Sequence, residues 1–573
     1  MLKTRLEEVS SDPVSAKGGS GPKWPAFSPY FPPRRAGEVV SLVEASSAFP
    51  VMETLILGAH NTASLAFRIL DPDTKTHSEA ASERGLSSWG EVFVDAAMRG
   101  VHLRILLADF EPVMAHDLHR LAWRNARRIM AYADRLPPDA PGEIDLLVAL
   151  HEGELGFGVR TGLWPAFRQK LKRLVGTRPD AVDWPGVAHF MLGERPRFVP
   201  PARLWPASHH QKLLVVDGER TVIGGIDVDE RRYDDARHDR PSDQTWHDVS
   251  LFADGLVAAD AERHFADVWN REVTRYGGDA QVSGWQRPPG YDHQQIPRMM
   301  VPPVAPADIG DGEPDRGTPS IRLRRTLSAV RSGAFAVTPI PVVTEIEAAV
   351  LDVIGEARLL LYIENQFFRL RRVADAIGAQ MQREKELEVV LLLPMAPDTV
   401  AFERQHGPEM RFGEWLQVRA LRRLIALGSR RVGVFSLVRA ARAEPGLDHR
   451  ARAFGSGIIY PHAKVMIADR RRALVGSANL NGRSLKMDTE AALDWRDDPR
   501  ISALQDRLFA EHLGAAVRAP DASEVSALEL WRRTAFANLE CAPGERNGFA
   551  VPYKLGAARR FARFQRFIPE SYL

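Results

Sequence analysis

Short apolar runs alternate with amphipathic stretches along most of this chain. From Val39 onward, strand-like runs such as ETLILGA and HLRILLA alternate with stretches such as AHDLHRLAWRNARRIMAYADRL, where apolar residues return every three or four positions. The alternation resumes after residue 320, where a helical VVTEIEAAVLDVIGEA precedes the apolar RLLLYIENQFF and LEVVLLLPMA. Alternating strands and helices predict an α/β fold in both halves.

Two segments interrupt this pattern. Residues 1–38 are rich in Ser, Gly and Pro, which predicts a loosely ordered arm that carries little core. Residues 287–320 contain so many Pro and Gly residues that neither helix nor strand is expected, so we place a linker there. The sequence therefore predicts a first lobe over residues 39–286 and a second lobe over residues 321–573.

The two lobes share a sequence motif. The segments HQKLLVVDGERTVIGG and HAKVMIADRRRALVGS both contain H-x-K, four residues, Asp, six residues, and then Gly followed by a small residue. This spacing marks a diverged tandem duplication, and the fold class it predicts is two similar α/β/α sandwich lobes. The motif residues are His210, Lys212 and Asp217 in the first copy and His462, Lys464 and Asp469 in the second.

Each motif is expected on a buried strand, because KLLVVD and KVMIAD are short and β-branched. Residues two apart on a strand share a face, so each His should point with its Lys, while Asp217 and Asp469 should point away and brace the fold. The glycines that follow let the backbone approach a bound group. Candidate binding positions after the strands are Gly225 and Asp227 in the first copy and Ser477 and Asn479 in the second.

This set of side chains suits phosphodiester chemistry. Two lysines and Asn479 can stabilise the negative charge that develops on phosphate oxygens. One histidine can be neutral and nucleophilic while the other is a protonated general acid, so that a covalent phosphohistidine divides one displacement into two. The chemistry requires no metal, and we expect no cofactor. The acidic run DVDERRYDDARHD lacks a calcium-loop pattern and is expected to be a solvated loop.

Composition narrows the possible partners. The 573 residues are 45% apolar and 26% charged, as in a soluble globular protein, and the formal charge of +2 does not favour nucleic acid as a partner. The single cysteine, Cys541, excludes internal disulfides. No signal-peptide h-region and no run of about 18 apolar residues is evident, which predicts a cytoplasmic or peripheral membrane location. Export without a cleaved signal stays open, and no obligate protein partner is inferred.

The motifs resemble those of the phospholipase D superfamily. Further segments resemble its lipid-hydrolysing branch: GGIDVDERRYDDARHD, TWHDVSLFADG, YIENQFF and GSANLNGRSLKMDTE. The resemblance implies one active site at the interface of the two lobes, with His210 as the nucleophile, His462 as the acid, and both lysines on the phosphate. It also implies that Asp248 and Glu490 hold the histidines. Gln366 and Asn365 are candidate pocket residues, although an amide that closes a strand explains them equally well.

One departure separates the two copies. The first reads G-G-I-D where the second reads G-S-x-N, and Asp227 cannot donate a hydrogen bond to phosphate as Asn479 can. We therefore expect the two halves to contribute unequally. The C-terminal AARRFARFQRFIPESYL places Phe561, Phe564 and Ile568 near one helical face, which is typical of an interfacial helix or of a helix packed on its own lobe.

The function expected from the resemblance is hydrolysis of the distal phosphodiester of a glycerophospholipid at a membrane surface. Phosphatidylcholine is the default substrate, and the products are phosphatidic acid and a free alcohol. Transfer of the phosphatidyl group to another alcohol would use the same residues. A nuclease and a non-catalytic lipid-binding scaffold are the remaining alternatives, and the near-neutral charge and the two intact motifs, respectively, argue against them.

Overall fold

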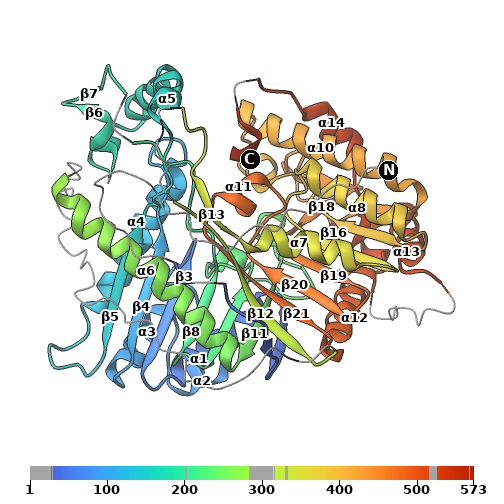
Figure 1. Cartoon of the computed structure of the whole chain (residues 1–573), viewed down its shortest axis with the longest axis horizontal. Coiled ribbons are helices and arrows are strands. Elements are labelled where there is room, and N and C mark those ends of the chain that lie inside the picture. Colours follow the sequence, from blue (N-terminus) through green and yellow to red (C-terminus); the bar gives the residue numbers. More distant parts are fainter. Residues whose placement is uncertain are drawn as a thin grey trace, which may run out of the picture.

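The structure is a computed structural model of the chain and contains two mixed β-sheets, each covered by helices (Figure 1). The prediction of two α/β lobes is confirmed. The residues that the structure describes are 27–28, 30–184, 186–200, 203–282, 314, 317–329, 333, 335–514, 525–566 and 568–573.

The first lobe is built on a seven-stranded sheet. In spatial order its strands are β2 (Val39–Val43), β11 (Val249–Asp254), β9 (Arg220–Gly224), β8 (Leu213–Val216), β3 (Thr62–Phe67), β4 (His102–Ala108) and β5 (Glu143–Ala149). One face packs on α6 (Leu256–Val282), and the other packs on α1 (Ala45–Leu57), α3 (Trp89–Met98) and α4 (His116–Ala133). Helices therefore cover both faces, as the long apolar strands require.

The second lobe is built on a larger, thirteen-stranded sheet. Its main path runs through β1 (Arg34–Arg35), β12 (Ser320–Ala329), β21 (Glu490–Arg496), β20 (Arg472–Gly476), β19 (Val465–Ala468), β14 (Leu360–Glu364), β15 (Glu388–Leu392), β16 (Val432–Arg442), β18 (Ser456–Pro461) and β10 (Trp246–His247). Three further strands pair with this path: β13 (Ile340–Thr344), β17 (Arg452–Ala453) and β22 (Ala550–Pro552).

Helices also cover both faces of this second sheet. The helices of one face are α7 (Glu345–Glu356), α8 (Arg371–Arg383) and α10 (Pro408–Gly428), and those of the other are α12 (Pro499–Leu513) and α13 (Ala527–Glu540). Outside these layers lie the long helix α5 (Phe157–Thr177) and the short elements α2 (Glu79–Glu83), β6 (Met191–Leu192), β7 (Arg195–Pro196), α9 (Asp398–Ala401), α11 (Gly482–Lys486) and α14 (Leu555–Phe561).

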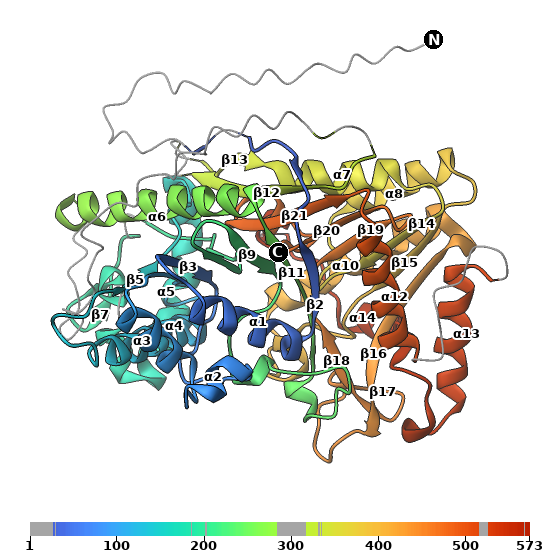
Figure 2. The same cartoon turned by 90° about the horizontal axis from the view of Figure 1, so that it is seen from below.

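The two lobes share strands and a core. Two strands from the first half, β1 and β10, end in the sheet of the second lobe, where β10 pairs in parallel with β18. Strands β9 and β11 lie against β20 and β21 in the centre of the molecule (Figure 2). One hydrophobic cluster accordingly includes Val215 and Leu251 from the first lobe with Val475 and Leu493 from the second. The interface between the lobes is a continuous apolar core.

The duplicated motifs form equivalent hairpins, β8–β9 and β19–β20. Asp217 and Asp469 sit at the turns with φ of 53° and 50°, a left-handed conformation that Asp tolerates better than most residues. Each carboxylate accepts three successive backbone N–H groups, at residues 60–62 and 358–360 respectively, over 2.8–3.0 Å. These aspartates tie each hairpin to the start of a neighbouring strand, β3 or β14.

The predicted N-terminal arm and linker need correction where the structure describes them. Phe31, within the predicted arm, is 1% exposed, and Arg34 forms an ion pair with Asp260 at 2.8 Å. The last part of the arm therefore contributes to the core, while residues 1–26 lie outside the described residues. Most of the predicted linker also lies outside them, and its final residue, Ser320, already begins β12.

The C-terminal segment differs from the predicted amphipathic helix. Helix α14 ends at Phe561, so the expected helical face does not continue to Ile568. The ring of Phe564 instead packs on Trp415 and Phe412, with centroids 5.0 and 5.9 Å apart. The continuous helix expected up to Ile568 is therefore wrong; Phe564 contacts its own lobe through one side of its ring and is 59% exposed. Among the helices that the structure describes, none is long and apolar enough to cross a bilayer.

Candidate active site

The first half-site forms where the chain enters β8. The N–H of His210 donates to the carbonyl oxygen of Thr489 (2.9 Å), which immediately precedes β21, so the second lobe fixes the backbone of this histidine. Nζ of Lys212 donates back to the carbonyl oxygen of His210 (2.6 Å). Both side chains are buried. The start of β8 therefore holds an imidazole and an ammonium group close together.

The second half-site repeats this arrangement at β19. The N–H of His462 donates to the carbonyl oxygen of His247 (2.7 Å) at the end of β10, which comes from the first half of the chain. Nζ of Lys464 donates to the carbonyl oxygen of His462, as its counterpart does in the first copy. Each motif is therefore anchored on a segment of the opposite half.

The two buried carboxylates cross between the lobes. Nδ1 of His210 lies 3.0 Å from Glu490, and Nδ1 of His462 lies 2.7 Å from Asp248. Each carboxylate thus orients the histidine of the other motif, across 280 and 214 residues of chain respectively. A carboxylate on Nδ1 selects the tautomer that carries its proton there, which leaves Nε2 available for chemistry.

Burial shapes the protonation of this site. It lowers the pKa of both histidines well below their usual range, and the nearby lysines lower it further. Burial also raises the pKa of Glu490 to about 8 and that of Asp248 to about 6. Since each histidine shares its proton with a carboxylate, each pair titrates as a unit. Between about pH 6 and 8, the Glu490–His210 pair therefore carries one more proton than the Asp248–His462 pair.

The lysines respond to the same environment. Burial lowers the pKa of Lys212 to about 8 and that of Lys464 to about 7. A phosphate anion between the two ammonium groups would restore their charge, because an opposite charge at short range favours the ionised form. The site is arranged to receive a negative group.

Comparison of the sequence with known proteins gives a family match. The domain family described as "Cardiolipin synthase, PLD-like domain" matches residues 350–513, which contain the second motif. "Phospholipase D1" of Schizosaccharomyces pombe is 27% identical over 396 residues, covering 54% of this chain and 27% of that protein. "Phospholipase D" of Phytophthora infestans is 28% identical over 335 residues, covering 46% and 18%. The chain belongs to the phospholipase D superfamily.

The match to these superfamily members is partial. The chain spans about a quarter or less of the length of the two relatives above. Among solved structures of similar fold is the phosphatidylserine synthase of Haemophilus influenzae Rd KW20, with 14% identity, a TM-score of 0.45, and coverage of 83% of this chain and 86% of that one.

In this member of the superfamily, the small residue that follows β9 and the one that follows β20 lie against the carboxylates that reach across to the other lobe. A Cβ on Gly225 would lie 2.1 Å from Oδ1 of Asp248, so a larger residue would displace that carboxylate. At the matching position of the second copy, the hydroxyl of Ser477 donates to Glu490. The position therefore supports the carboxylates in both copies, by leaving space in one and by a hydrogen bond in the other.

Asp227, two residues after Gly225, differs more strongly from its counterpart in the second copy. Asp227 is fully buried, pairs with Arg232, lies 3.8 Å from Nζ of Lys212, and accepts the N–H of Ile69. Its oxygens face protein donors, so we place it as the counter-ion of Lys212 instead of as a substrate ligand. Burial opposes its charge, yet these cations hold its pKa below the usual value.

Asn479 occupies that position in the second copy. Its Nδ2 donates to Oε1 of Gln366 (3.1 Å), and Nε2 of Gln366 donates to the hydroxyl of Tyr460 (2.9 Å). Gln366 therefore lies beside the second half-site. Asn365 lies beside Lys464, and its Oδ1 accepts the N–H groups of Phe367 and Leu480, as an amide that closes a strand does.

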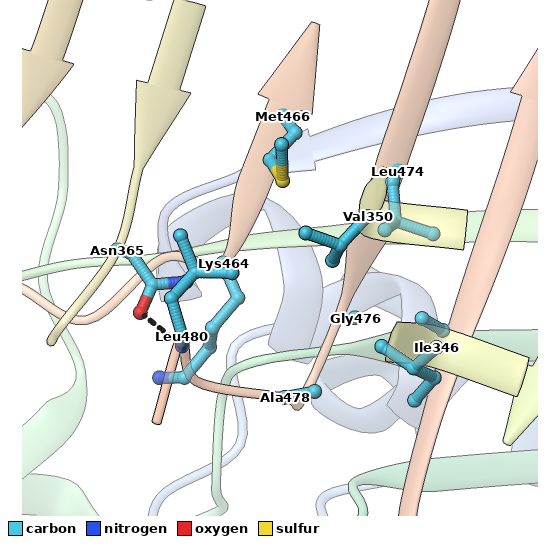
Figure 3. Close-up of a pocket in the computed structure, with 10 residues that line it drawn as sticks. Ile346, Val350, Asn365, Lys464, Met466, Leu474, Gly476, Ala478 and Leu480 are labelled. Atoms are coloured by element: carbon cyan, nitrogen blue, oxygen red, sulfur yellow. Dashed lines mark hydrogen bonds between the residues drawn. The ribbon is translucent and has the colours of Figure 1, made fainter. Parts of the chain in front are cut away.

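A small cavity lies directly behind Lys464 (Figure 3). It measures about 20 Å³, which is room for about one water molecule. Its lining is mostly apolar and includes Ile346, Val350, Met466, Leu474 and Leu480, with Asn365 at one side. This apolar wall explains why burial lowers the pKa of the lysine, and the cavity is too small to hold a lipid.

The acidic loop after the first motif was mispredicted. The sequence predicted a solvated loop, whereas Asp234 and His238 are each 1% exposed and Arg232 is 7% exposed. The loop supplies Arg232 to Asp227 and places Asp234 against His238 at 2.7 Å. The signal in the sequence was His238 and Arg232 among the acidic residues, because a loop that pairs internally can be buried.

Proposed function

We propose that this protein is a phospholipase D-type phosphodiesterase that releases the head-group alcohol of a glycerophospholipid and leaves phosphatidic acid, with phosphatidylcholine as the first substrate to test. The observation that carries the proposal is the pair of buried histidines, each oriented at Nδ1 by a carboxylate of the opposite half and accompanied by a lysine. A single half supplies only part of this machinery.

The proposed reaction has two displacements at phosphorus. Nε2 of His210 attacks, the bond from phosphorus to the head-group oxygen breaks, and His462 gives its proton to the departing alkoxide. Water then attacks the phosphohistidine, His462 takes a proton from it, and the bond from phosphorus to nitrogen breaks. Lys212 and Lys464 stabilise the charge on the non-bridging oxygens throughout. An alcohol in place of water gives a phosphatidyl-alcohol by the same steps.

A lipid substrate is favoured by the surface near this site. Large apolar side chains are exposed along α5 and the segments packed on it: Phe157 (61%), Leu192 (73%), Phe198 (85%), Val199 (69%) and Phe335 (82%). We call this set the α5 apolar edge. The segment that leads into α5 reaches the site, because Nε2 of His151 lies 3.1 Å from Oγ1 of Thr489, the residue before Glu490. Exposed apolar groups of this size are typical of protein or membrane contacts.

A panel of head-group-labelled lipids tests the activity. We expect release of the labelled alcohol together with phosphatidic acid, and, when a primary alcohol is added, formation of the phosphatidyl-alcohol without prior phosphatidic acid. Product formed solely by transfer would replace the hydrolase proposal with a transferase. Cleavage of DNA or RNA with no lipid turnover would replace it with a nuclease, and no turnover at all would leave a lipid-binding scaffold.

Vesicle sedimentation tests the membrane contact separately. The double variant Phe198→Ser/Phe335→Ser should bind phosphatidylcholine vesicles at least several-fold more weakly, while hydrolysis of a soluble monomeric diester is unchanged. Phe536→Ser is the matched control, because Phe536 is 56% exposed but lies on α13. Equal vesicle binding by both variants would refute a role for the α5 apolar edge.

A further inference from the structure

Four metal-ligating side chains converge on one buried point beside β10. They are Glu44, His238, His247 and Glu511, and their nearest ligand atoms all lie within 4.8 Å of one another. Glu44 follows β2, His238 lies in the loop after the first motif, His247 ends β10, and Glu511 lies on α12. None of the four belongs to the two H-x-K motifs.

The spacing of the ligand atoms suits a small divalent ion. Nε2 of His238 lies 3.4 Å from Oε1 of Glu511 and 3.8 Å from Oε1 of Glu44, and Nδ1 of His247 lies 3.4 Å from the same Glu511 oxygen. Zinc bonds to His nitrogen and carboxylate oxygen at about 2.0–2.2 Å in tetrahedral geometry, which places neighbouring ligand atoms roughly 3.3–3.5 Å apart. The fourth His–carboxylate pair, His247 and Glu44, is in direct contact and would have to open slightly.

The outer contacts of both histidines match those of metal ligands. Nδ1 of His238 lies 2.7 Å from Asp234, which leaves its Nε2 facing the cluster. Nε2 of His247 lies 2.7 Å from Glu364, which leaves its Nδ1 facing the cluster. A histidine that binds metal almost always donates its other ring N–H to such a partner, which fixes the tautomer. Here two histidines do so in opposite senses and point their other ring nitrogens at one spot.

Three ligand atoms in the cluster also lack hydrogen bonds. Within the part of the chain that the structure describes, Nε2 of His238, Oε2 of Glu44 and Oε1 of Glu511 are buried and have no hydrogen-bond partner. The side chains of His238 and Glu44 are 0% and 1% exposed. Buried polar atoms without partners are rare and indicate an unmet ligand. Two of these atoms, Nε2 of His238 and Oε1 of Glu511, lie 3.4 Å apart, a spacing that one shared cation would explain.

We infer that Glu44, His238, His247 and Glu511 bind one divalent transition-metal ion, with Zn²⁺ the best fit to two imidazoles and two carboxylates. The ligand set is closed by four protein groups and buried, which is typical of structural sites and not of catalytic ones. The ion would join three ligands of the first half to Glu511 on α12, which packs against β2 (Figure 2).

The site lies directly behind the catalytic centre. Successive side chains of an extended segment point to opposite faces, so His247 faces the cluster while Asp248 faces His462. The carbonyl oxygen of His247 also accepts the N–H groups of His462 and Ala463, at 2.7 and 3.1 Å. A metal on His247 would therefore fix the segment that positions His462, without contact to the phosphate.

Metal content tests the inference without any activity assay. The full chain, purified without chelator and dialysed, should contain about one equivalent of zinc by elemental mass spectrometry. His238→Gln should lose the metal. His512→Gln should keep it, because His512 contacts Glu364 and belongs only to the alternative group His247, Glu364 and His512. His119→Gln is a second control, since His119 is buried against Asp109 but is not part of either group.

Two outcomes of these measurements would overturn the inference. A metal-free protein that also takes up no Zn²⁺ or Co²⁺ on titration would mean that protons, not a metal, balance these carboxylates, and would overturn the inference. Loss of metal in His512→Gln but not in His238→Gln would move the site to the alternative group and also overturn it. If His238→Gln folds poorly, the visible bands of tetrahedral Co²⁺ in the wild-type protein, with a melting temperature that rises on Co²⁺ binding, give the same decision.

Discussion

The two half-sites have the same backbone arrangement but differ in the charge of the residue at one equivalent position. In the first, a buried carboxylate, Asp227, stands between Lys212 and Arg232. In the second, an amide, Asn479, takes that position and is held by Gln366. A carboxylate can only accept, so Asp227 serves the lysine, whereas Asn479 has an N–H to offer. The first half-site is thus an ion-pair network, and the second offers donors to a bound phosphate.

The two histidine–carboxylate pairs also differ, in the pH at which each loses its proton. The Glu490 pair retains its proton to about pH 8, while the Asp248 pair loses its proton near pH 6. This order favours His462 as the neutral imidazole, which is opposite to the assignment implied by the resemblance. A bound phosphate adds negative charge beside both pairs and changes their proton affinities together. Isolation of the phosphohistidine decides the matter: we expect it on His210, and an adduct on His462 would exchange the roles.

The largest expected effect comes from removal of either histidine. His210→Ala and His462→Ala should each lower turnover by at least about 10²- to 10⁴-fold, because a positioned acid–base group contributes that much and the nucleophile more. His209→Gln is the matched control, since this neighbouring side chain contacts Glu272 and has no counterpart beside His462. If either alanine variant keeps a tenth of the activity while its circular dichroism is native, the shared site is wrong.

Replacement of the crossing carboxylates should separate the two pairs by pH. With His210 as the nucleophile and His462 as the acid, the reactive form has a deprotonated Glu490 pair and a protonated Asp248 pair, so we expect kcat/KM to be highest between about pH 6 and 8 and to fall on either side. Asp248→Asn should remove the acidic limb and Glu490→Gln the basic limb, each with a loss of about 10²-fold at the optimum. Identical profiles for the two variants would show that the pairs are equivalent.

Exchange of the residues that differ between the copies should give two distinct defects. Asp227→Asn leaves Lys212 and Arg232 without their buried anion, which should lower the free energy of unfolding by about 3–5 kcal/mol. Asn479→Asp places a carboxylate near the phosphate and should instead raise KM about tenfold, with little change in melting temperature. Denaturant titration and steady-state kinetics distinguish these effects, and the same defect in both variants would contradict the proposed asymmetry.

The smallest expected effect on catalysis comes from the hairpin aspartates. Asp217→Ala and Asp469→Ala each leave three backbone N–H groups without their acceptor, which should lower stability by roughly 1–3 kcal/mol. Turnover per folded molecule should stay near that of the wild-type protein. A loss of activity as large as that of the histidine variants, in a protein with a native melting temperature, would assign these aspartates to the chemistry.

Sequence reasoning succeeded where a pattern repeats and was incomplete where contacts are long-range. The duplicated spacing predicted the two lobes and the motif residues, because strand periodicity fixes which side chains share a face. The crossing of Asp248 and Glu490 between lobes depends on how two sheets pack, which no local pattern encodes. The buried loop around His238 was missed for a related reason: its charges are paired with groups such as Glu44 and Glu511, which lie far away in the sequence.

The exchange of carboxylates between the halves also bears on how such a molecule can be divided. Two separate copies of one half, related by a two-fold axis, would orient each other's histidines by the same contacts, as in an isologous dimer. Joining them in one chain raises the effective concentration of each half for the other, so assembly no longer depends on protein concentration. Fusion also ends the requirement that both halves be identical. Asp227 and Asn479 are a difference that a symmetric dimer could not hold.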